Sequence, residues 1–115
     1  MRIHLLSDLH NEFSPFIPQL LDTDVVILAG DIDVKTRGVA WAKKTFSGPV
    51  LYVPGNHEYY GGHLSRTLEK MRAAQDERVR VLDRDEAIIS DVRFLGATMW
   101  TDFAATGNPP IASFS

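Results

Sequence analysis

Apolar residues gather in short blocks along the chain, and three such blocks dominate its first half. They occupy residues 1–7, 25–29 and 50–53. Each block is continuous rather than alternating, which is typical of strands buried on both faces of a sheet. Turn-forming or polar residues end each block: the loop from Asp8 to Glu12, then Gly30-Asp31, then Pro54-Gly55. The pattern therefore predicts three buried strands.

Helical spacing appears between and after these blocks. The segment 36–46 is apolar at mixed helical spacing and stops at Ser47-Gly48-Pro49. The segment 62–75 carries Leu64, Leu68 and Met71 as a stripe at i, i+4 and i+7, with basic residues opposite. Both segments are predicted helices.

The second half returns to short apolar runs. Residues 79–82, 87–90 and 92–97 predict three more strands, the last two joined around Asp91 as a hairpin. Residues 103–115 lose all periodicity and are expected to form a loop or frayed end. Strands alternating with helical crossovers favour an α/β fold with a parallel sheet covered on both faces. We expect one domain over residues 1–115.

Composition narrows the choice of partners and metal ligands. The apolar fraction of 44% and charged fraction of 23% are ordinary for a globular protein, and a net charge of −3 predicts no general nucleic-acid partner. The chain has no cysteine, so any metal must be held by oxygen and imidazole nitrogen. Residues 1–7 are too short for a signal-peptide core or a membrane span, which suggests the cytoplasm by default and no membrane partner.

Polar side chains follow each of the three predicted strands. The groups in question are Asp8 and His10, then Asp31 and Asp33, then Asn56, His57 and Glu58. Ligands of open parallel sheets bind outside the carboxyl ends of the strands, so these groups are expected to share one crevice. Carboxylate, imidazole and amide donors suit Mn, Fe, Zn, Co or Ni. A carboxylate can also bridge two cations roughly 3.5–4 Å apart, the spacing used by phosphatases.

Three ordered motifs resemble a known family. Asp8-Leu9-His10, Gly30-Asp31 and Gly55-Asn56-His57-Glu58 are similar to the first three motifs of the calcineurin-like metallophosphoesterases. Residues 95–101 also resemble a later strand of bacterial members, so the resemblance spans about residues 1–103. It implies a layered α/β/β/α fold and metal-dependent hydrolysis of phosphomonoesters or phosphodiesters by a metal-activated hydroxide.

The resemblance also assigns roles to the residues. It implies that Asp8 and His10 bind a first divalent metal, that Asp31 bridges two metals, and that Asn56 binds the second. His57 would bind no metal; it would stabilise the phosphoryl group or protonate the leaving oxygen. The loop after Asp31 lacks the Val-Asp-Arg-Gly continuation of the protein phosphatase branch, and Pro54 stands where that branch has Arg. A small-molecule or nucleotide phosphoester is therefore the expected substrate.

One departure from the family changes the expectation. The family's remaining ligands are histidines of its second half, whereas no histidine follows His63 here. We therefore expect a domain truncated after its first half, with a poor second metal site. The alternative function is a catalytically impaired domain that binds metal, phosphate or a partner without turnover. Truncation is also expected to leave apolar sheet surface exposed and to favour self-association.

Structural roles compete with the functional ones. Asp8 or Asp31 alone could be a strand-end or helix-capping residue, although chance placement of all three motifs is improbable. His4 is expected in the core or at a sheet edge, and His63 at the start of the second helix. Two further expectations have equal weight. Asp33 stays solvated, and Glu58 supports His57 as a hydrogen-bond acceptor. The core is expected to contain Trp41, Trp100 and Phe103. The pair Tyr59-Tyr60 either packs against the following helix or shapes the substrate mouth.

Overall fold

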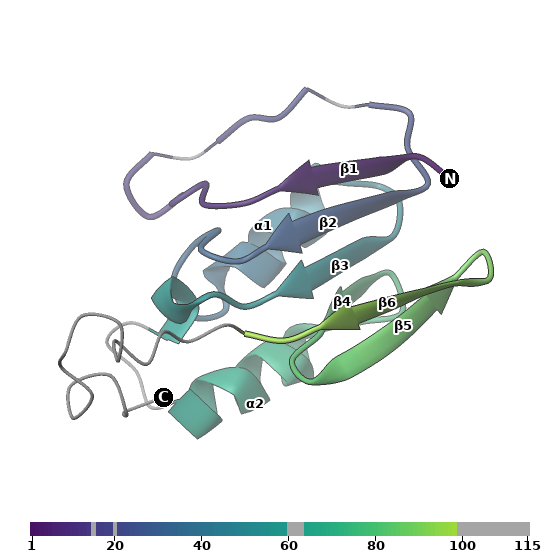
Figure 1. Ribbon diagram of the computed structural model, residues 1–115. Helices are drawn as coiled ribbons and strands as arrows, with labels where there is room; N and C mark the ends of the chain where they lie inside the picture. The colour runs from purple at the N-terminus through teal and green to yellow at the C-terminus, as the bar shows by residue number, and fades with distance from the viewer. Residues whose placement is uncertain (15, 20, 60–63, 99–115) are drawn as a thin grey trace, which may run out of the picture.

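The computed structural model describes residues 1–14, 16–19, 21–59 and 64–98, which form a mixed α/β arrangement around one parallel sheet (Figure 1). Its four strands lie in the order β1-β2-β3-β4, and each pairs in parallel with its neighbour. They are β1 (Ile3–Leu6), β2 (Val25–Ala29), β3 (Val50–Val53) and β4 (Val79–Val81). The predicted α/β class is confirmed.

Two helices cover one face of the sheet as parallel crossovers. Helix α1 (Arg37–Thr45) joins β2 to β3, and α2 (Leu64–Ala74) lies between β3 and β4 (Figure 1). Both agree with the predicted helices, of which residues 62 and 63 lie outside the described residues. The core beneath them contains Leu28, Val39, Ala42, Tyr52, Met71 and Val81, among others. This helical layer fixes the strands whose ends carry the polar loops.

A hairpin covers part of the opposite face. Strands β5 (Asp85–Ile89) and β6 (Val92–Gly96) pair in antiparallel fashion, as predicted, although β5 begins earlier than the pattern indicated. Ser90 and Asp91 form the turn with positive φ angles of 51° and 65°, the conformation that tight hairpins require. Ala87 of the hairpin packs in a second core cluster with Val25, Leu51 and Leu82.

Arg78 connects the start of β4 to the end of α1 through hydrogen bonds. Its guanidinium donates hydrogen bonds to the carbonyls of Lys43 (2.8 Å), Phe46 (2.6 Å) and Gly48 (3.0 Å). The last carbonyls of a helix have no partner within the helix, and a cation there also favours the helix dipole. One side chain thus closes the helix and anchors the edge strand.

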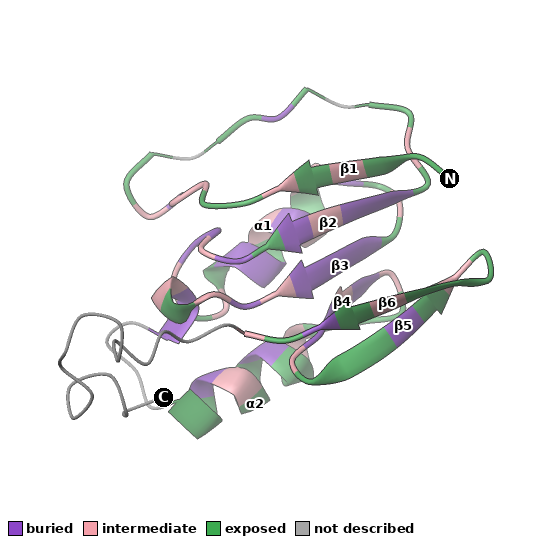
Figure 2. Ribbon diagram, in the orientation of Figure 1, coloured by how far each residue is buried: buried purple, intermediate pink, exposed green. Residues whose placement is uncertain are grey.

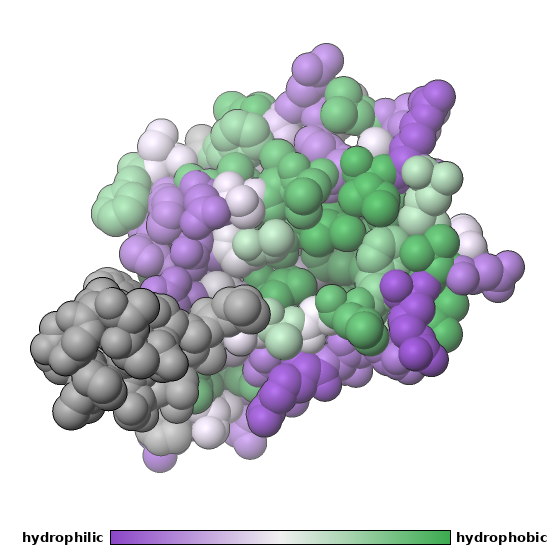
Figure 3. All heavy atoms as spheres, in the orientation of Figure 1, coloured by the Kyte–Doolittle hydropathy of each residue, from purple (hydrophilic) through white to green (hydrophobic). Residues whose placement is uncertain are grey.

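Strand β1 is the other edge of the sheet, and the hairpin does not reach it. Ile3 pairs with Val25 and Leu5 with Ile27, so both side chains face the hairpin side. They are nevertheless 48% and 63% exposed (Figure 2), and Figure 3 shows apolar side chains gathered over this face. The prediction that the first strand is buried on both faces is therefore wrong. A continuous apolar run has the same sequence pattern at an edge as at the centre.

Several expectations about single residues have clear outcomes. His4 lies on the edge strand β1, as expected, with its ring against that of Phe46. Trp41 packs against the helical core, and Tyr59 is buried. The expectations for Tyr60, His63, Trp100, Phe103 and the segment 103–115 concern residues outside the described ranges. Among the described residues, no helix is long and apolar enough to cross a membrane.

The exposed apolar face leads to a test of self-association. We expect the weight-average mass in sedimentation equilibrium to rise with protein concentration, because uncovered apolar patches favour association. Leu5→Lys should reduce this rise, since a charge on the edge strand opposes pairing of two copies. Leu64→Lys, a matched change at an exposed position on α2, should leave it unchanged. A constant monomer mass at all concentrations would contradict the expectation.

Candidate metal centre

The loops after β1 and β2 run side by side and are joined by backbone hydrogen bonds. The amide of Asp8 donates to the carbonyl of Gly30 (3.0 Å), and that of His10 to the carbonyl of Asp31 (3.0 Å). The amide of Asn11 continues the series to the carbonyl of Ile32 (2.7 Å). These bonds extend the parallel pairing of the two strands into their loops, and they bring the side chains of both loops to one edge.

The three residues predicted to bind the first metal share an unusual backbone conformation. Asp8, His10 and Asp31 have φ angles of 54°, 49° and 54°, in the left-handed region that most side chains avoid. Asp and His adopt this region more readily than bulky or β-branched residues. Residues held there cluster at functional sites, where surrounding structure compensates the strain. The inter-loop hydrogen bonds provide that compensation.

Asp8, His10 and Asp31 form a group with the composition of a metal site. One ligand atom from each lies within 4.8 Å of the others, and the group is exposed or half-buried, so solvent reaches it. Two carboxylates and an imidazole are a suitable partial ligand set for a divalent transition metal. The structure thus brings together three of the four predicted metal ligands; that they bind metal stays a prediction.

The third loop meets Asp31 at close range. The amide of His57 donates to Oδ1 of Asp31 over 2.8 Å. A Cβ atom on Gly55 would clash with the same Oδ1, so only glycine permits this approach. Asn56 and His57 begin the short 3₁₀ helix η1 (Asn56–Tyr59) directly after this glycine. The side chain of Asn56 is exposed and that of His57 half-buried. The loop that carries both residues contacts Asp31 through the amide of His57.

Glu58 is the fully buried residue that holds these loops together. Its Oε1 accepts hydrogen bonds from the amides of Asp31 (2.8 Å) and Gly55 (2.6 Å). Its Oε2 accepts from the amides of Ile32 (2.7 Å) and Asp33 (3.2 Å) and from the hydroxyl of Tyr52 (2.7 Å). The expectation that Glu58 supports the side chain of His57 is replaced by a different role: its carboxylate binds the loop backbones.

Burial and hydrogen bonding act in opposite directions on Glu58. Burial raises the pKa of its carboxyl above the ordinary value, and the hydrogen bonds from Tyr52 and the loop amides oppose that rise. Burial, together with the nearby Glu58 charge, raises the pKa of the Tyr52 hydroxyl well above its usual value. The hydroxyl therefore remains a donor to the carboxylate. Gly38 of α1 makes room for it, because a Cβ there would clash with that hydroxyl.

Asp33 is not solvated as expected. Its side chain is buried, and Oδ1 accepts a hydrogen bond from the amide of Val34 (2.7 Å). The same oxygen lies 3.6 Å from Nε of Arg37, in an i,i+4 ion pair at the start of α1. Asp33 therefore shapes the turn into the helix, a role that Asp often has near helix N-termini.

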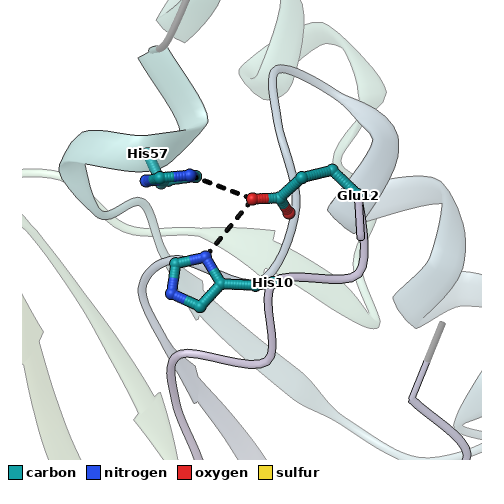
Figure 4. A group of neighbouring side chains, drawn as sticks. All are labelled: His10, Glu12 and His57. Carbon is teal, nitrogen blue, oxygen red and sulfur yellow. Dashed lines mark hydrogen bonds and ion pairs between the residues drawn. The ribbon is translucent and has the colours of Figure 1, made fainter. Parts of the chain in front are cut away.

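Glu12 is the residue of this edge that the sequence pattern did not identify. Its Oε1 lies 3.3 Å from Nδ1 of His10 and 3.0 Å from Nε2 of His57 (Figure 4). The three side chains also satisfy the geometry of a possible metal group. The available signal was the polar run from Asp8 to Glu12, but nothing in its spacing indicated that Glu12 turns back toward His10.

The edge as a whole is strongly acidic. Asp8, Glu12, Asp31, Asp33 and Glu58 all come from the three loops described above. Such a concentration of carboxylates favours a cation, and a phosphate group would be repelled without one. The charge of the loops therefore agrees with the chemistry of the donor set.

Comparison with known proteins gave one significant result. The family model described as a calcineurin-like phosphoesterase superfamily domain matches residues 1–98. No curated protein and no solved structure matches the chain significantly. The matched range contains all three loops and the described parts of every helix and strand.

The buried carboxylate of Glu58 generates a stability prediction. Glu58→Gln should lower the free energy of unfolding by about 2–4 kcal/mol, because the amide nitrogen of Gln would face backbone donors. Tyr52→Phe removes only one of the donors and should cost about 1–2 kcal/mol. Chemical denaturation followed by circular dichroism measures both changes.

Glu69→Gln, at an exposed position of α2, is the matched control for Glu58→Gln and should change the unfolding free energy by less than about 0.5 kcal/mol. If Glu58→Gln were as stable as this control, the loops would not depend on the carboxylate.

Proposed function

The chain belongs to the calcineurin-like phosphoesterase superfamily, and from that membership we propose that it hydrolyses phosphate esters with the help of divalent cations. The observation that carries the proposal is the meeting of Asp8, His10 and Asp31, with ligand atoms within 4.8 Å of one another, at an acidic edge of the sheet. The proposed substrates are small-molecule or nucleotide phosphoesters.

The residues present fit a first cation better than a second. Asp8, His10 and Asp31 would hold the first, and Asp31 with Asn56 the second; Mn, Fe, Zn, Co or Ni suit such oxygen and nitrogen donors. Bound cations supply the positive charge that activates water for attack at phosphorus and neutralises the phosphoryl oxygens. Asp31 is central because its Oδ1 also accepts the amide hydrogen of His57.

In this proposal, His57 acts on the substrate from the third loop. Its backbone is fixed by the hydrogen bond to Asp31, and its ring lies 4.6 Å from that of His10, centroid to centroid. An imidazole in this position would stabilise the phosphoryl group or donate a proton to the leaving oxygen, a contribution typically worth about 10²–10⁴ in rate. Its half-buried position keeps it accessible to substrate.

A second candidate function is binding of metal or phosphate, or of a partner, without turnover. The observation that favours it is the sparse second site: among the described residues, Asp31 and Asn56 are the only predicted ligands there. Two protein donors hold a cation less firmly than the three or more of an ordinary site. Metal binding without hydrolysis would support this alternative.

Hydrolysis assays test the primary proposal. With added Mn²⁺, the chain should hydrolyse a chromogenic phosphomonoester or phosphodiester, and EDTA should abolish the reaction. Asp31→Asn should reduce turnover to background because the shared ligand loses its charge. His57→Ala should reduce it by about 10²–10⁴-fold while leaving metal binding, measured by calorimetry, unchanged.

Two control variants match these substitutions. Asp91→Asn changes an aspartate that also has a positive φ but lies in the hairpin turn, and His4→Ala removes a histidine of β1. Both should retain wild-type turnover. Hydrolysis that persists in Asp31→Asn would contradict the proposal, and metal binding without hydrolysis in the wild type would favour the second candidate.

A further inference from the structure

Glu12 joins two histidines that have different proposed roles. One oxygen, Oε1, lies 3.3 Å from Nδ1 of His10 and 3.0 Å from Nε2 of His57 (Figure 4). The centroids of the two rings are 4.6 Å apart, and the ring planes are nearly perpendicular, at 83°. Each ring thus presents one particular nitrogen to the same carboxylate oxygen. His10 comes from the β1 loop and His57 from η1, so Glu12 also connects two separate segments.

The carboxylate of Glu12 is largely removed from solvent. Its side chain is only 11% exposed, and Oε2 is buried without a hydrogen-bond partner among the described residues. A buried carboxylate needs hydrogen bonds or opposite charge to offset its lost hydration. The partners that the described structure offers Oε1 are two imidazole nitrogens: Nδ1 of His10, at hydrogen-bond geometry, and Nε2 of His57, at ion-pair distance.

Hydrogen-bond chemistry then restricts both rings. An ionised carboxylate has acceptors only, so each nitrogen that faces it must carry a hydrogen. A neutral imidazole carries one hydrogen, and the other nitrogen is an acceptor. A neutral His10 is therefore protonated at Nδ1, and a neutral His57 at Nε2. The shared acceptor selects opposite tautomers in the two rings.

We propose that Glu12 is a positioning residue that fixes His10 as the Nδ1–H tautomer and His57 as the Nε2–H tautomer. The inference rests on the proposed function in giving the His10 tautomer a purpose. Nε2 of His10 then carries no hydrogen and is the ring nitrogen free to act as a ligand in the group that His10 forms with Asp8 and Asp31. Histidines that bind metals generally donate their other nitrogen to a carboxylate or carbonyl in this way.

The inference differs from a direct metal-binding role for Glu12. Because Glu12, His10 and His57 have ligand atoms within 4.8 Å of one another, they could themselves hold an ion. An ion held by the two nitrogens that face Glu12, Nδ1 of His10 and Nε2 of His57, would remove both hydrogens. Positioning by Glu12 retains both hydrogens when metal binds, so the two possibilities give opposite spectra.

The decisive measurement is the tautomer of each ring. Long-range ¹H–¹⁵N correlation spectra of protein labelled with ¹⁵N-histidine should be recorded at about pH 8, above the ordinary histidine pKa of roughly 6.5. We expect His10 protonated at Nδ1 and His57 at Nε2 in the metal-free protein. Single substitutions, His4→Ala, His63→Ala and His57→Ala, assign all four histidine signals, and the last of them separates His57 from His10. Saturation with Zn²⁺ should shift Nε2 of His10 and leave both hydrogens in place.

Two substitutions of Glu12 show what depends on the carboxylate. Glu12→Leu removes both acceptor oxygens and should release His10 from the Nδ1–H tautomer and weaken Zn²⁺ binding by about 10–100-fold. Glu12→Gln keeps one acceptor oxygen and should restore part of both properties. Glu69→Gln, at an exposed position of α2, should behave as wild type. Amide spectra of the core strands verify that each variant is folded.

The outcomes separate this inference from the proposed function. His10 protonated at Nε2 in the wild type, loss of either hydrogen on adding Zn²⁺, or unchanged tautomers and affinity in Glu12→Leu would each overturn it. If Glu12→Leu does not fold, the wild-type tautomers alone decide. These measurements need no turnover, so the expected tautomers in a protein without hydrolase activity would refute the proposed function and leave the role of Glu12 standing.

Discussion

The site depends on one buried carboxylate. Glu58 binds backbone amides of the loops after β2 and β3, and Tyr52 adds a hydroxyl from within the helical core. The bonds to the loop after β2 join residues 25–27 positions apart, so they form only when the sheet has assembled. Because the bonds go to the backbone, they fix the path of the loop whatever side chains it carries. The geometry of Asp31 and the position of His57 both follow from this path.

Around this constraint, charge is distributed in two layers. Glu58 and Asp33 are buried, and their carboxylates accept hydrogen bonds from the loop backbone, so they stabilise the loops. Asp8, His10 and Asp31 remain open to solvent and keep donor atoms for a ligand. Glu12 lies between the two layers, partly buried but directed at the two histidines. The acidic character of the edge therefore has a structural component and a chemical one, which composition alone does not distinguish.

Sequence reasoning succeeded where a general rule of topology applied. Continuous apolar blocks and helical stripes predicted the α/β order, and the rule that parallel strands direct their carboxyl ends to one edge predicted that Asp8, His10 and Asp31 would meet. It failed where the outcome depended on the course of a loop. Neither the turn of Glu12 toward His10 nor the contact of Glu58 with amides of the preceding loop has a signature in residue spacing. The sequence predicted exposed apolar sheet surface but not that Ile3 and Leu5 of the first strand would carry it, because edge and central strands share one pattern.

Two independent constraints act on Asp8, His10 and Asp31: their left-handed backbone and the chemistry of a metal ligand. The left-handed region favours Gly, Asn, Asp and His over bulky or β-branched residues, and a divalent cation selects carboxylate and imidazole donors. Asp and His satisfy both constraints, so the local backbone already favours residue types that can bind a metal. Placing these residues on a regular helix or strand would preserve their chemistry but would change the direction in which their side chains point. The transferable unit is the pair of adjoining loops, including the carboxylate that holds them.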